Sequence, residues 1–122
     1  MSHLDATLGE FGRLLQLEGL RLGESGVAAL EIEGLGNLQL ERHETGLVML
    51  LSRELAFAEP AQMEKALELC DPREDWSYQP QAALLGENNL VFGMIIPERE
   101  AAPATLSRML NQLEDLHERV TT

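Results

Sequence analysis

The fold is decided by the stretch from Val27 to Phe57, VAALEIEGLGNLQLERHETGLVMLLSRELAF, which predicts three consecutive strands with two tight turns. In its first predicted strand, Leu30 and Ile32 point to one face, and Glu31 and Glu33 point to the other. This period of two is typical of a half-buried strand. We therefore expect an antiparallel three-stranded meander around which the other elements are arranged.

Two reversals, GLGN at 34–37 and HETG at 43–46, separate the three strands. Their glycines accept positive φ angles, which hairpin turns between antiparallel strands require. The third strand carries Met49 on one face and Val48 and Leu50 on the other, so both faces are apolar. Such a strand is either covered on two sides or presents an apolar face to a partner.

The residues before the meander predict an amphipathic helix from about Ser2 to Glu18, with Ser2 as a candidate N-cap. The members of its apolar stripe, at helical spacing, are Leu4, Leu8, Phe11 and Leu15. Leu14 and Leu17 widen this stripe beyond what one packing surface needs. Either the whole stripe belongs to the core, or its wider edge stays exposed and grips a peptide.

The residues after the meander predict a second helix that begins at Pro60, a hairpin of strands 82–85 and 90–96, and a last helix entered at Pro103. Gly93, inside the second hairpin strand, indicates a bulge or a close approach by another element. The order of helix, three-stranded antiparallel meander, helix, two-stranded hairpin and helix predicts an α+β fold in one domain over residues 1–122.

A polar loop, DPREDWSYQP, ends the second helix and holds the tryptophan and the tyrosine of the chain. Trp76 and Tyr78 are either anchors that fix this loop on the core or contacts for a ligand. Both side chains are large rings with one polar atom, and such rings more often serve as anchors.

The composition is strongly acidic, with 21 Asp and Glu against 9 Lys and Arg and a formal charge of -12. This charge disfavours binding to nucleic acid or to an anionic membrane surface, and it favours either simple solubility or a basic partner segment. Cys70 has no second cysteine to pair with, which fits a reducing compartment. Because neither a signal peptide nor a long apolar run is recognisable, we expect a cytoplasmic protein.

Catalytic and metal-binding patterns are not found in the sequence. His3, His43 and His117 lie far apart, and none has a cysteine or histidine at ligand spacing, so we expect no metal site. Glycine-rich phosphate or dinucleotide motifs and a nucleophile elbow are also missing. The sequence therefore predicts a protein without cofactors that is not an enzyme.

Three motifs carry a resemblance to a known family: LQLERH at 38–43, LSRELA at 51–56 and LLGENNLVF at 84–92. Together with the order of elements, the size and the acidity, they resemble the class I type III secretion chaperones, the Tir chaperone (CesT) family, and within it most closely the SycN subgroup. The resemblance covers nearly the whole chain.

This resemblance implies a dimer, either of two copies or with a sister chaperone, that holds the amino-terminal segment of a secreted effector or gatekeeper protein in extended form. By position in the element order, the implied dimer interface comprises Met63, Ala66, Leu67, Cys70, Ala83 and Leu85. The implied cargo-binding residues are Phe11, Leu14, Leu17, Leu30 and Ile32. The alternative function, from the acidity and the apolar surface, is an adaptor that binds one folded partner.

Overall fold

The computed structural model describes residues 3–56, 59–74 and 76–121. Ser2, the candidate helix cap, and Phe57, at the end of the stretch that decides the fold, lie outside these ranges. The described chain forms helices α1 (His3–Leu14), α2 (Pro60–Leu69) and α3 (Pro103–Thr121), strands β1 (Val27–Ile32), β2 (Gly36–His43), β3 (Gly46–Glu54), β4 (Gln81–Leu85) and β5 (Asn89–Ile96), and a 3-10 turn, η1 (Glu98–Glu100). The predicted α+β order is confirmed.

The five strands form one antiparallel sheet in the order β1-β2-β3-β5-β4. The register between β3 and β5 runs without interruption from the Leu47–Ile96 pair to the Glu54–Asn89 pair. The carboxyl-terminal hairpin therefore extends the meander, and the sheet is continuous through a pairing between residues far apart in sequence.

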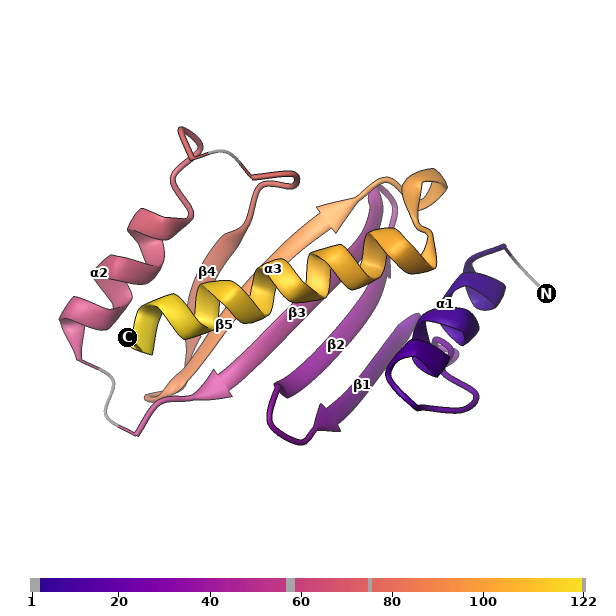
Figure 1. Cartoon of the computed structure of the whole chain (residues 1–122), viewed down its shortest axis with the longest axis horizontal. Helices are drawn as coiled ribbons and strands as arrows, with labels where there is room; N and C mark the ends of the chain where they lie inside the picture. The colour runs from indigo at the N-terminus through magenta and orange to yellow at the C-terminus, as the bar shows by residue number, and fades with distance from the viewer. Residues whose placement is uncertain (1–2, 57–58, 75, 122) are drawn as a thin grey trace.

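The helices gather on one face of the sheet, where α3 crosses the strands and α1 and α2 flank it at opposite ends (Figure 1). The inner stripe of α3 recurs at spacings of three and four residues and is buried along its whole length. It meets the side of the sheet that carries Leu40, Met49 and Phe92, all fully buried. This face of the sheet holds the core.

The first helix is shorter than predicted, because α1 ends at Leu14 and not near Glu18. The Gln16 N–H donates to the Arg13 carbonyl at 2.9 Å, and the Leu17 N–H donates to the Gly12 carbonyl at 2.8 Å. These two bonds are those of a Schellman motif, which terminates a helix with one left-handed residue. That residue is Gln16, with a φ of 64°. The apolar residues beyond it continue the periodic pattern without continuing the helix.

The loop after α2 is fixed to the helices, which confirms that Trp76 and Tyr78 are anchors. The Trp76 indole N–H donates to the Leu69 carbonyl at 2.8 Å, at the end of α2. The Gln112 side chain on α3 donates to the Tyr78 carbonyl at 3.1 Å. Both rings are half-buried against the core.

Candidate functional site

The face of the sheet turned away from the helices, called here the open face, is apolar at its centre. The strand register puts Val48 opposite Ile95 and Ala83 opposite Val91 on this face, and Leu50 opposite Gly93. Ile95, a large aliphatic residue near the end of β5, is 44% exposed. The apolar centre of the open face is a candidate site of interaction with another molecule.

Gly93 has a specific packing role on the open face. A Cβ atom at this position would lie 2.3 Å from Cδ2 of Leu50. The Leu50 side chain therefore lies directly over the backbone of β5. The close approach expected from the sequence is made by a side chain of the neighbouring strand, and no bulge interrupts the register.

Two shallow hollows lie on the open face, on either side of Leu50 and Val91. One, of about 280 Å3, is bordered by Ala29, Gln39 and Leu85, with Glu31 at its rim. The other hollow, of about 330 Å3, is lined mainly by aliphatic side chains. Both hollows are open to solvent, which suits the side chains of a partner more than a small molecule, because ligand pockets bury most of a ligand's surface.

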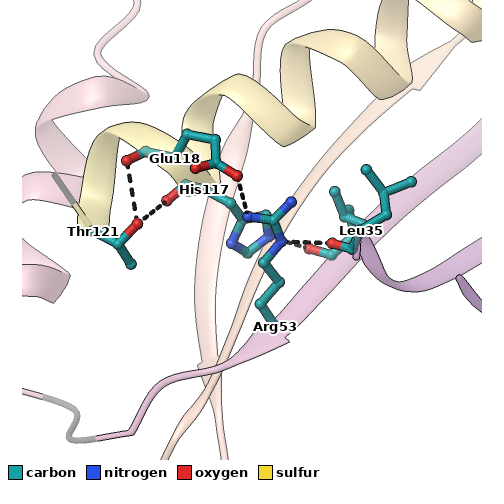
Figure 2. A network of polar contacts seen from close by, with 6 residues as sticks. Leu35, Arg53, His117, Glu118 and Thr121 are labelled. Atoms are coloured by element: carbon teal, nitrogen blue, oxygen red, sulfur yellow. Dashed lines mark hydrogen bonds and ion pairs between the residues drawn. The ribbon is translucent and has the colours of Figure 1, made fainter. Parts of the chain in front are cut away.

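A polar network joins α3 to the carboxyl-terminal end of β3 (Figure 2). Nε of Arg53 donates to the Leu35 carbonyl at 2.5 Å, and Nη1 of Arg53 donates to the Glu118 carboxylate at 2.9 Å. The Arg53 guanidinium therefore connects the β1–β2 turn, strand β3 and helix α3. These contacts stabilise the fold at a point where three elements meet.

His117 is buried beside this network. Its Nε2 lies 2.7 Å from the Leu51 carbonyl oxygen, which can only accept, so Nε2 carries the proton. The ring meets Phe92 edge to face at a centroid distance of 4.9 Å. Burial lowers the pKa of His117, and the nearby Arg53 charge acts in the same direction. His117 is therefore a neutral histidine of the core, and its hydrogen bond and ring contact account for its burial.

No group of three metal-ligating side chains comes together in the described ranges of the chain. Burial raises the pKa of the Cys70 thiol to about 11, so the sulfur stays protonated at neutral pH and is a poor nucleophile. No helix among the described residues has the length and apolar character needed to cross a bilayer.

Comparison with protein families identifies the family of this chain. The sequence model of the type III secretory system chaperone SycN matches residues 3–121. The chain belongs to the SycN family of type III secretion chaperones. Members of the SycN family are chaperones and not enzymes, which confirms the prediction that the chain is not an enzyme.

Two relatives within the SycN family have similar sequences over three quarters of their length. The chaperone protein SycN of Yersinia enterocolitica is 37% identical over 93 residues, which cover 75% of each chain. The SycN protein of Yersinia pseudotuberculosis is 36% identical over 93 residues, again 75% of each chain.

Several solved structures share the fold. The Yersinia pestis chaperone SycH, solved with a stable fragment of YscM2, has a TM-score of 0.72 at 20% identity, with 92% of this chain and 94% of SycH covered. The HopA1–SchA chaperone–effector complex gives 0.69 at 20% identity, covering 96% and 92% of the two chains. The ExoU–SpcU complex of Pseudomonas aeruginosa gives 0.66 at 20% identity, covering 95% and 93%.

The residues predicted to bind cargo in this SycN family member are split between core and surface. Phe11 is fully buried, so it belongs to the core and is corrected from a surface residue to a packing residue. It lies on the same buried face of α1 as Leu4 and Leu8. Leu14 is 63% exposed. The half-buried members of the set are Leu17, Leu30 and Ile32.

The residues predicted for the dimer interface are divided in the same way. Ala66 is fully buried inside the chain and is likewise corrected to a core residue. Leu67 and Leu85 are 55% and 58% exposed, on α2 and β4 respectively. Ala83 is exposed beside Leu85, while Met63 on α2 and Cys70 at its carboxyl-terminal cap are half-buried.

Sequence reasoning missed three apolar residues of β4 and β5. Ile95 and Val91 lie on the open face, and Leu84 is 37% exposed on the helical side of β4, where it borders a hollow with Met63. The signal for Val91 and Ile95 was the lack of polar alternation in β5. This pattern can be interpreted only when the pairing of β5 with β3 is known.

Proposed function

We propose that this chain is a class I type III secretion chaperone of the Tir chaperone type, which binds the amino-terminal segment of a secreted effector or gatekeeper protein in extended form. Binding would keep that segment soluble and competent for secretion. The observation that carries the proposal is apolar surface left exposed after folding, in a chain of the SycN family. Two of the solved structures that share the fold are complexes of a chaperone, SycH with a stable fragment of YscM2 and the HopA1–SchA chaperone–effector complex.

The proposed cargo surface lies at the β1 end of the molecule. Leu14 is largely exposed there, and Leu17, Leu30 and Ile32 each keep part of their side chain accessible. Strand β1 is an outer strand of the sheet, so an extended segment can add to it through backbone hydrogen bonds. The acidic surface favours a cargo segment that carries Lys or Arg.

The proposed subunit interface lies at the opposite end of the sheet, on β4 and α2. Strand β4, QAALL, is an outer strand without a charged residue or proline, the features that normally protect a sheet edge. Leu67, Ala83 and Leu85 would pack against a second copy or a sister chaperone. We propose a cytoplasmic dimer that binds neither nucleic acid nor membrane.

The test is co-expression of the chain with the amino-terminal segments of secreted proteins encoded beside it in its genome, followed by pull-down and limited proteolysis. We expect one segment to be retained and protected in an extended form. Retention of no segment would refute the proposal. A retained partner that keeps its own core protected in amide exchange would instead support an adaptor that binds a folded protein.

A further inference from the structure

The outer edge of β1 leaves the backbone groups of two residues, Ala29 and Glu31, without partners. The Arg42 N–H donates to the Gly26 carbonyl at 2.9 Å, so these two residues form a hydrogen-bonded pair next to the β1–β2 ladder. Directly opposite residues of an antiparallel ladder alternate between hydrogen-bonded and non-hydrogen-bonded pairs. The pairs that involve Ala29 and Glu31 are therefore of the second kind, and the N–H and C=O groups of both residues point away from β2.

The chain itself closes both ends of this free edge. The Gly23 N–H donates to the Val27 carbonyl at 3.0 Å, which occupies the edge before Ala29. After Glu31 the chain turns at residues 33–35 and returns as β2. Among the residues that the structure describes, none forms a hydrogen bond with the outward backbone groups of Ala29 or Glu31. An added strand can therefore pair with β1 over this short length only.

The side chains beside this edge make the open face acidic. Of the described residues that border the hollow of about 280 Å3, only Glu31 is charged. The two Lys or Arg residues within the described strands, Arg42 and Arg53, alternate onto the helical side, where each contacts a glutamate. Glu31 is exposed and has no ion pair in the described chain. A side chain placed opposite Glu31 therefore meets an uncompensated carboxylate.

We propose that the cargo segment adds to β1 as a strand through Ala29 and Glu31, and that Glu31 selects a Lys or Arg of the cargo at the position opposite to it. Directly opposite residues of a strand pair share a face, with Cβ atoms about 4.5–5.5 Å apart, and opposite charges there stabilise the pair. The next cargo residue faces the helical side beside half-buried Leu30, where an apolar side chain is favoured. This inference rests on the proposed function, and it adds the sequence pattern and the length of the bound strand.

The first test is amide hydrogen exchange, measured by NMR on the chain with and without the cargo segment that it protects from protease. In the free chain, the amides of Ala29 and Glu31 should exchange quickly, whereas those of Ala28 and Leu30, which bond to β2, should be protected. Bound cargo should slow exchange at Ala29 and Glu31 about tenfold or more. Unchanged exchange at both amides with the segment still bound would overturn the inference, while the chaperone proposal would stand.

The second test is a charge swap, measured by fluorescence anisotropy of the labelled segment at low and at physiological salt. Glu31→Lys should weaken binding about fivefold at low salt and less at the higher salt, because it replaces attraction with repulsion. Replacing one Lys or Arg of the cargo by Glu should then restore the affinity. The matched control is Glu100→Lys, at an exposed glutamate of η1 without an ion pair in the described chain.

The control should change the affinity less than about twofold, and no charge change in the cargo should compensate for it. If Glu31→Lys binds the segment as tightly as the wild-type chain, or if no cargo substitution restores its binding, Glu31 does not select the cargo. If the wild-type chain retains no cargo segment at all, the proposed function fails together with this inference.

Discussion

Replacing Arg53 by methionine tests whether the polar network of β3 and α3 stabilises the fold through its buried or its exposed contact. Methionine keeps most of the aliphatic length of the side chain and removes the guanidinium. The Arg53 side chain is 22% exposed, and its Nε–H donates to the Leu35 carbonyl at the β1–β2 turn. The Glu118 carboxylate at the other end of the contact is 58% exposed.

The two contacts differ in their expected free energies. A hydrogen bond from a charged donor contributes about 1.5–3 kcal/mol, whereas an exposed ion pair contributes about 0.2–1 kcal/mol. We therefore expect Arg53→Met to lower the free energy of unfolding by about 2–3 kcal/mol. Glu118→Gln, the matched control, should lower it by about 0.5 kcal/mol or less.

The assay is urea unfolding followed by circular dichroism at pH 7, with thermal melts at a fixed protein concentration because subunit association would alter the apparent stability. With roughly 4 °C of melting temperature for each kcal/mol in a chain of this size, Arg53→Met should melt about 10 °C lower. Equal losses in both variants would show that the ion pair carries the energy. Losses below about 0.5 kcal/mol in both would refute the network as a stabilising feature.

Further predictions concern single residues. His117→Gln should be less stable than wild type at pH 7, but its stability should depend less on pH. The pKa of His117 is lowered from its usual 6.5 in the folded state, so the unfolded state takes up the proton first and wild-type stability falls as the pH drops below about 6.5. Thermal melts between pH 8 and pH 5 measure this difference. Gln16→Gly should raise stability by up to about 1 kcal/mol in urea unfolding, since φ is 64° there; a loss would contradict the helix-end geometry. Gly46→Ala should cost more than about 3 kcal/mol, because its Cβ would overlap the Ile96 carbonyl, whereas Gly34→Ala, also at positive φ but in open space, should cost about 1 kcal/mol. Leu85→Lys should leave the melting temperature of the single chain unchanged but shift light scattering from dimer to monomer, and a persistent dimer would place the interface elsewhere.

The strand pattern was sufficient to predict the order of elements, because apolar alternation and hairpin glycines are local signals. The end of α1 could not be predicted in the same way. Leu15 and Leu17 continue the helical spacing, and the residue that stops the helix is Gln16, not the glycine usually found there. Local sequence gave no sign that this position adopts a left-handed conformation.

The exposed surfaces were only partly predictable, because exposure depends on which strands become neighbours. Val48 and Leu50 were recognised as a second apolar face of their strand. Ile95 joins them only through the pairing of β3 with β5, which no local pattern specifies. Phe11 could not be separated from Leu14 by composition, since both belong to one wide apolar stripe and only the docking angle of α1 buries one and exposes the other.

The central position of β3 has a consequence for how the molecule is made. One neighbour, β2, precedes β3 in the chain, but the other, β5, follows only after α2, the anchored loop and β4. On the ribosome, a nascent β3 therefore has one unpaired edge while the intervening residues are still being added. Unpaired edges of apolar strands readily join other chains. A member of a chaperone family is thus itself most prone to aggregate in the interval before its last strand emerges.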